Sequence, residues 1–180
     1  MRIGNCSGFY GDRLTAMREM LTGGDLDYLT GDYLAELTML ILARDRAKAP
    51  ERGYAKTFLI QLEECLGLAH ERGVRIVANA GGLNPAALAA AVRSLAERLG
   101  VPVRVAHVEG DDLLARAAEL GWGSPLAANA YLGAWGIVEC LNRGADIVVT
   151  GRVTDASVLV GPAAAHFGWR HTDYIELAGA

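Results

Sequence analysis

The segment Val74-Arg75-Ile76-Val77-Ala78 is a short run of mostly β-branched residues, and Asn79-Ala80-Gly81-Gly82-Leu83-Asn84-Pro85 follows it directly. Such runs are typical of buried strands. We expect an alanine-rich helix from Pro85 to Leu99, because proline is favoured in the first turn of a helix and Gly100 is a typical residue just past its end. A strand followed by a helix is the repeating unit of a parallel α/β sheet.

Further runs on both sides of this unit repeat the pattern. Residues 146–150 are apolar on both faces, which places them near the centre of a sheet, while Pro102 places residues 101–108 near an edge. The helix expected from Asp32 carries Leu34, Leu37 and Ile41 on one stripe. The expected strands cover residues 2–6, 26–30, 74–78, 101–108 and 146–150, and the expected helices cover 12–21, 57–72, 85–99, 127–143 and 154–167, with two more beginning at Asp32 and Asp111.

This order of elements predicts an α/β fold with a mainly parallel sheet and helices on both faces, Rossmann-like and doubly wound. The 180 residues, of which 52% are hydrophobic, suffice to bury the core of one domain. The net charge of −4 comes from basic and acidic residues mixed along the chain, so neither nucleic acid nor an anionic membrane is an expected partner. Polar residues interrupt the longest apolar stretch, residues 127–141, which argues against a membrane span.

The cysteines and the N-terminus indicate a cytoplasmic location. The three cysteines form no C-x-x-C pair, which is typical of reduced thiols. The first residues lack the pattern of a secretory signal. Cys6 could be a nucleophile if a helix terminus acidified its thiol, but a small core residue is the simpler interpretation.

Five polar segments each follow an expected strand. Because the carboxyl ends of parallel strands meet at one edge of the sheet, these segments are expected to form a single polar surface that binds a small molecule. The segments are residues 5–8, 30–32, 79–85, 109–112 and 150–155.

Charged residues of this surface are candidates for catalysis. Arg152 can bind a carboxylate or phosphate through two N–H groups, and a salt bridge to Asp155 or Asp112 is the alternative. Asp32 and Asp155 could act as acid and base. If the helix begins at Asp32, Glu36 lies on the same helix face, and the two carboxylates together with Asp155 could bind a divalent cation. The spacing identifies no further ligands for such a cation, so we assign no metal. The simpler alternative is that Asp32 caps the helix.

Asn79 leaves its strand toward the expected site, and its amide can both donate and accept, so we expect it to orient a ligand or position a loop. Backbone N–H groups at residues 5–8 could bind an anion, although G-x-G-x-x-G is absent and a tight turn capped by Asp12 is equally expected. Catalytic roles are thus expected for Asp155, Asp32 and Asn79. Substrate-binding roles are expected for Arg152, Asn5, Ser7, Gly8, Gly81, Gly82 and Thr154.

Four segments together resemble the amino-terminal domain of the acyclic terpene utilisation protein family: Gly4 to Arg13, Asp27 to Glu36, Asn79 to Pro85 and Thr150 to Ser157. The resemblance extends over essentially the whole chain. It implies a domain that is longer than 180 residues, so residues 1–180 are expected to be its front part, with the sheet incomplete at the carboxyl end.

The resemblance also implies a function. Members are bacterial cytosolic proteins encoded with acyl-CoA carboxylases and dehydrogenases that degrade terpenoids such as citronellol and geraniol, and no cofactor or catalytic residue comes with the resemblance. We therefore expect an enzyme of acyclic terpenoid or branched acyl-CoA breakdown that acts on an anionic small molecule. A hydratase or lyase reaction is compatible with these residues, but the residues do not distinguish one reaction from another. The alternative is a noncatalytic subunit that binds an acyl-CoA or a carboxylase partner; a homo-oligomer is compatible with both.

Overall fold

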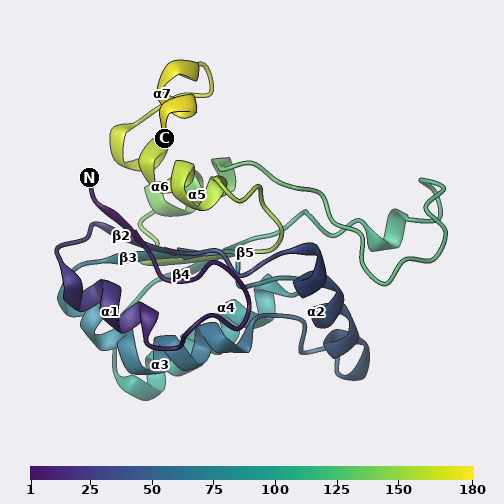
Figure 1. The fold of residues 1–180 in the computed structure, drawn as a ribbon, viewed down its shortest axis with the longest axis horizontal. Coiled ribbons are helices and arrows are strands. Elements are labelled where there is room, and N and C mark those ends of the chain that lie inside the picture. The colour runs from purple at the N-terminus through teal and green to yellow at the C-terminus, as the bar shows by residue number, and fades with distance from the viewer.

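The fold is built on five strands that all run in the same direction, as a computed structural model of residues 1–180 shows (Figure 1). They are β1 (Ile3–Asn5), β2 (Tyr28–Gly31), β3 (Arg75–Ala78), β4 (Val105–Val108) and β5 (Ile147–Thr150), in the order β1-β2-β3-β5-β4. Every neighbouring pair is parallel, which confirms the predicted α/β class. As predicted, β4 lies at an edge and β5 inside the sheet.

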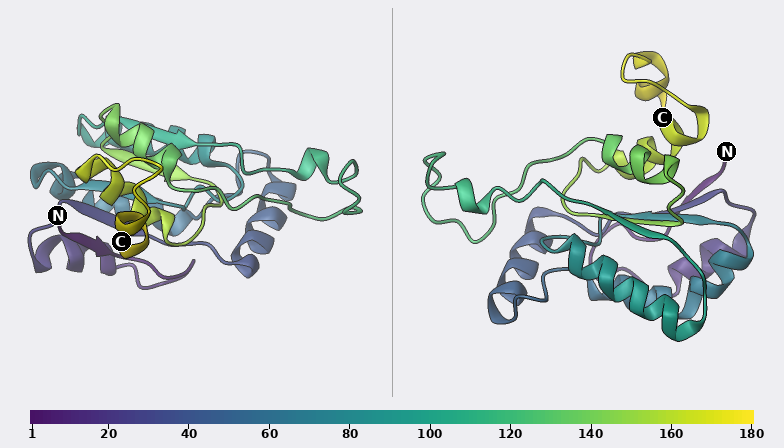
Figure 2. Two further views of the ribbon diagram at one scale, coloured as in Figure 1. Left: turned by 90° about the horizontal axis from the view of Figure 1, so that it is seen from above. Right: turned by 180° about the vertical axis from the view of Figure 1, so that it is seen from behind.

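Helices cover both faces of the sheet, again as predicted. One face packs against α1 (Ala16–Gly23), α3 (Lys56–Glu71) and α4 (Pro85–Leu99), and the other against α5 (Trp135–Asn142) and α6 (Ser157–Phe167) (Figures 1 and 2). The last helix, α7 (Tyr174–Gly179), stands beyond α6, and α2 (Glu36–Lys48) lies beside the carboxyl edge of the sheet. None of these helices combines the length and the apolarity that crossing a membrane requires.

The direction of winding reverses after β4, where α5 returns the chain to β5 across the other face. The chain leaves β3 for α4 on one face, but it leaves β5 for α6 on the other face. Because β3 and β5 are neighbours in the sheet, the helices that follow these two strands diverge at the carboxyl edge, the usual place for a ligand in an open α/β sheet. The strand order itself differs from that of the dinucleotide-binding Rossmann fold.

The larger core lies between the sheet and α1, α3 and α4, where Met17, Phe58 and Leu88 are fully buried. A smaller core under α5 and α6 contains Ile137 and Val148. Consecutive residues of β5 thus contribute to opposite faces, which explains why this strand is apolar throughout.

The prediction of a helix from Asp111 is wrong, and the helix predicted over 127–143 begins only at Trp135. Residues 109–134 instead form an extended arm with a single short 3-10 helix (Leu114–Arg116), and this arm reaches away from the sheet (Figure 1). Backbone hydrogen bonds pair the two sides of its base, from Leu113 N to the Ala128 carbonyl at 2.7 Å and from Ala130 N to the Asp111 carbonyl at 2.8 Å.

The start and the phase of α2 also differ from prediction. The helix begins at Glu36, so residues 32–35 form a loop and Asp32 is neither a helix cap nor on a helix face with Glu36. Leu37 and Ile41 of the expected apolar stripe are exposed, while the buried residues include Met39 and Leu42. Spacing alone predicts which residues share one side of the helix. The loop before the helix determines which side packs against the rest of the protein.

Candidate functional site at the carboxyl edge

Arg152 follows β5 and is nearly buried, with 4% of its surface exposed. Its Nη1 donates to the Leu34 carbonyl at 2.8 Å, and its Nη2 donates to Asp155 Oδ1 at 3.2 Å. The guanidinium carbon lies 4.1 Å from the centre of the Tyr131 ring. Its Nε has no hydrogen-bond partner, and an unpaired buried donor costs about 1–3 kcal/mol.

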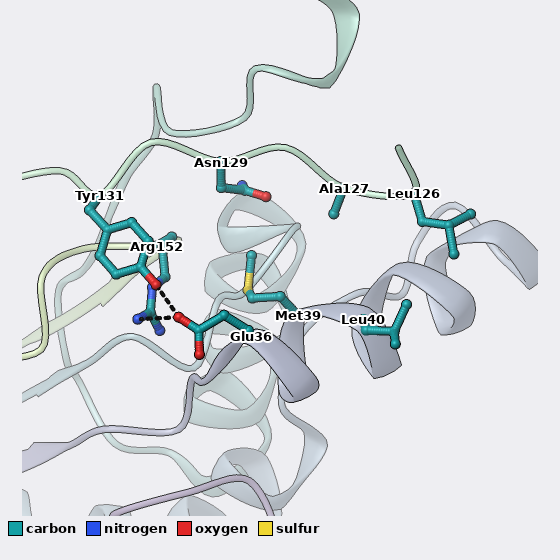
Figure 3. Close-up of a pocket in the computed structure, with 8 residues that line it drawn as sticks. All are labelled: Glu36, Met39, Leu40, Leu126, Ala127, Asn129, Tyr131 and Arg152. Atoms are coloured by element: carbon teal, nitrogen blue, oxygen red, sulfur yellow. Dashed lines mark hydrogen bonds and ion pairs between the residues drawn. The ribbon is translucent and has the colours of Figure 1, made fainter. Parts of the chain in front are cut away.

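A cavity of about 370 Å³ opens between α2 and the arm, with Arg152 at one end (Figure 3). This volume falls in the usual range for small-molecule sites, roughly 300–1,000 Å³. Most of the lining is apolar, so the cavity fits a molecule with a hydrophobic body and a polar end. The lining residues are Glu36, Met39 and Leu40 from α2, Leu126, Ala127, Asn129 and Tyr131 from the arm, and Arg152.

Glu36 and Tyr131 join the two walls of the cavity. The Tyr131 hydroxyl donates to Glu36 Oε1, and the same oxygen lies 3.9 Å from Arg152 Nη2 (Figure 3). The hydrogen bond from Tyr131 and the positive charge of Arg152 lower the pKa of Glu36, so its carboxylate is ionised near neutral pH. This end of the cavity therefore holds a paired, not a free, arginine charge.

Asn79 is fully buried and fixes the loop that carries Asp32. Its Oδ1 accepts from Tyr33 N at 2.7 Å, and its Nδ2 donates to Asp32 Oδ1 at 2.6 Å. Burial and the negative charge of Asp155 raise the pKa of Asp32, against the opposing effects of Asn79 and Arg152. A half-buried carboxyl with a raised pKa is a candidate for proton transfer. Asp32 thus pairs with Asn79 and Arg152 with Asp155, and the charges of the second pair act on Asp32, but of these four residues only Arg152 lines the cavity.

Polar groups of the first strand-to-helix turn are paired within the turn. Gly8 N donates to Asp12 Oδ2 at 3.0 Å, Ser7 Oγ donates to the Phe9 carbonyl at 3.1 Å, and Asn5 Nδ2 donates to the Ser7 carbonyl at 3.0 Å. The Asp12 carboxylate thus occupies the position that an anion would take at Gly8. This arrangement fits the capped-turn interpretation better than a substrate-binding role for Asn5, Ser7 and Gly8.

The two glycines after β3 are needed for packing. A Cβ on Gly81 would lie 2.5 Å from the Thr150 carbonyl oxygen, and one on Gly82, which has φ +55°, would lie 2.4 Å from Leu42 Cδ1. Protein atoms thus occupy the space beside both glycines in which a side chain would lie. The hydroxyl of Thr154 is 2.5 Å from that of Ser157, at the start of α6.

Cys6 is buried, and desolvation raises the pKa of its thiol to about 12. A thiol in this state is not a nucleophile at neutral pH, so the core interpretation holds. No group of three or more His, Cys, Asp or Glu side chains has a geometry that could hold a metal ion.

Sequence reasoning missed the importance of Asp111, which is 3% exposed. Its Oδ2 accepts from Arg152 N at 2.7 Å and from Asn129 Nδ2 at 2.9 Å, so one carboxylate links the Arg152 loop to the arm. A Cβ on Gly151 would lie 2.4 Å from Asp111 Oδ1, which explains the glycine before Arg152. Burial raises the pKa of Asp111, and these two hydrogen bonds oppose that shift.

Tyr131 was missed as well, because no local pattern marks a tyrosine in an extended segment as the cover of a distant arginine. Asn129 lines the cavity and donates to Asp111. Both residues reach the site through the fold of the arm.

Comparison with known proteins identifies a family. Residues 1–180 match the model of the family described as "Acyclic terpene utilisation family protein AtuA". No curated protein and no solved structure matches the chain.

Proposed function

The chain belongs to the acyclic terpene utilisation family, and on this premise we propose that it is an enzyme that acts on an acyclic terpenoid or a branched acyl-CoA derived from one. The proposal places the terpenoid chain in the cavity between α2 and the arm and its oxygen-bearing end at Arg152. We further propose a bacterial, cytoplasmic setting. One observation carries the proposal: a nearly buried arginine with an unpaired Nε stands at the end of a mainly apolar cavity.

The two halves of the cavity suit the two halves of such a molecule. Met39, Leu40 and Leu126 offer apolar contact to a hydrocarbon chain, whose transfer from water contributes binding energy in proportion to the area buried. Arg152 supplies a donor for an oxygen, and its contacts with Leu34 and Asp155 hold it in place. The proposed site therefore binds the oxygen-bearing end of the ligand in a defined orientation, and the hydrocarbon chain packs against the apolar wall.

Asp32 is the group proposed to move a proton. Asn79 donates to Oδ1 of this carboxyl, which leaves Oδ2 to carry the proton. Its raised pKa keeps a larger fraction protonated near neutral pH than an ordinary aspartate has. Addition or removal of water across a carbon–carbon double bond needs such a group to give or take a proton, so a hydratase or lyase step fits the residues.

The second candidate function is a noncatalytic subunit that binds an acyl-CoA or a partner protein. Exposed apolar side chains on the arm, Trp122 and Leu126, favour this candidate because such residues are enriched at protein interfaces.

The two candidates differ in turnover. Purified protein is incubated with citronellol, with geraniol and with their acyl-CoA derivatives, and the products are followed by mass spectrometry. The enzyme proposal expects a mass change of 18 Da, the mass of water, that Asp32→Asn abolishes and that Asp25→Asn, on the exposed surface, leaves intact. Binding without any change of mass would support the noncatalytic subunit.

A further inference from the structure

The outer part of the arm, residues 113–126, has little contact with the rest of the chain. Within it only Ala117 is buried, while Leu120, Trp122 and Leu126 are 38%, 51% and 58% exposed. Figures 1 and 2 show that it extends away from the sheet and from the helices that cover the sheet. So few buried groups do not offset the entropy of ordering the segment, and exposed apolar groups of this kind are typical of a contact surface.

Helix α2 has a second apolar stripe on the side that faces away from the core. Leu37 and Ile41 are 68% and 45% exposed, and Arg44 and Lys48 extend the same stripe at spacings of three and four residues. The buried residues of the helix, among them Met39, lie on the opposite side. A helix that is apolar on two opposite sides is usually covered on both.

The two exposed surfaces have the same partner in our interpretation. We infer that the outer part of the arm packs against the outer stripe of α2 in a second copy of this chain, and that the second copy makes the same contact in return. This inference concerns assembly and does not depend on the reaction that the site catalyses. It assigns the exposed residues of the arm to a dimer and not to a different protein.

Charge makes the two surfaces complementary. Arg44 and Lys48 are exposed and form no ion pair in the structure, so the outer stripe of α2 carries unpaired positive charge. The arm, residues 109–134, contains four acidic residues and one basic residue. Its Glu119 pairs only with the neighbouring Arg116, at 3.0 Å. Exposed ion pairs add little affinity, but complementary charges determine the orientation in which two surfaces meet.

Both surfaces lie at the same end of the molecule, because α2 and the arm form the two walls of one cavity (Figure 3). A two-fold axis therefore lets each copy contribute its arm and its helix at once, and the same contact forms twice. A different protein would have to match both surfaces, whereas this chain carries both halves of the match. Leu40 and Leu126 line the cavity beside these surfaces, so the second copy also shields the apolar cavity from water.

Sedimentation equilibrium of the full chain tests the inference, and we expect a dimer at about 50 μM. Leu37→Ser and Trp122→Ser each remove an apolar side chain from both contacts, so each is expected to weaken the dimer at least about tenfold. Ile175→Ser is the matched control, because this side chain is 86% exposed on α7, outside both surfaces. It should change the dissociation constant by less than about twofold, and circular dichroism checks that all three variants are folded.

Cross-linking then shows which surfaces meet. One preparation carries Leu37→Cys and another carries Trp122→Cys, both with the partly exposed Cys140 replaced by serine. The two preparations are mixed and treated with a short thiol-reactive cross-linker. We expect mass spectrometry to find peptides that join position 37 of one copy to position 122 of the other.

Three results would overturn the inference. A monomer at this concentration would mean that the arm and α2 do not bind a second copy, and would leave both surfaces to a different protein. A dimer that either Leu37→Ser or Trp122→Ser leaves intact would be held by other surfaces. A dimer in which position 37 never cross-links to position 122 would lack the proposed contact.

Discussion

Asp111 is the residue whose removal is expected to damage the scaffold of the site most, although it lies outside the cavity lining. In Asp111→Ala the backbone N–H of Arg152 loses its acceptor in a buried position, which costs about 1–3 kcal/mol. The lost hydrogen bond from Asn129 adds roughly 0.5–1.5 kcal/mol. Removing a buried carboxylate returns part of its desolvation cost, so we expect a net loss of about 2–3 kcal/mol in the free energy of unfolding.

The assay is urea unfolding followed by circular dichroism, with a thermal melt as a second readout. A chain of this length loses about 2–4 °C in Tm for each kcal/mol, so the expected decrease is roughly 4–12 °C. Asp112→Ala is the matched control, because the neighbouring carboxylate is exposed and pairs with Arg46, a contact worth about 0.2–1 kcal/mol. Asp112 also accepts from Leu114 N at 2.9 Å, but this donor lies in an exposed position where water can replace the carboxylate. If the two variants lose the same stability, Asp111 does not connect the arm to the Arg152 loop.

Three further outcomes are expected. The raised pKa of Asp111 means that the folded state binds its proton more readily than the unfolded state does, so its contribution to stability is fully present below the unfolded-state pKa and is lost as the pH rises through the folded-state pKa. The unfolding free energy of the unmodified protein, minus that of Asp111→Asn, should therefore fall as the pH rises above about 4, and a rise would contradict the shift. A thiol reagent should modify the partly exposed Cys140 in native protein and leave the buried Cys6 unmodified until unfolding, and mass spectrometry of peptides checks the order. Gly82→Ala should cost about 1–3 kcal/mol because its Cβ would overlap Leu42 at a positive φ, whereas Gly23→Ala, with open space around it, should change stability by less than about 0.5 kcal/mol in chemical denaturation.

Local signals were sufficient to predict the βα unit at the centre of the chain. Asn84 caps α4 through a bond from Ala87 N, Pro85 begins the helix, and Gly100 ends it with φ +67°, as their residue types indicate. The apolar run of β5 likewise identifies an inner strand, because both of its faces are buried. The meeting of the polar turns at one edge followed from parallel strands alone.

Contacts between residues that lie far apart in the sequence could not be predicted from local patterns. An acid ahead of an apolar stretch looks like a helix cap, yet Asp111 is held by Asn129 and Arg152, which lie 18 and 41 positions further along the chain. Glu36 and Tyr131 form a hydrogen bond although they lie 95 positions apart in the sequence. Spacing within one helix carries no information on such pairs, so the cavity and its arm became visible only with the fold.

The most direct test of the site is the N–H signal of the Arg152 Nε in a proton–nitrogen NMR spectrum, assigned by its loss in Arg152→Lys. Titration with citronellol should shift this signal in a saturable manner, together with the methyl signals of Met39 and Leu126 that line the same cavity. A ligand that shifts signals elsewhere and leaves these three unchanged would contradict the placement of the functional site at the carboxyl edge.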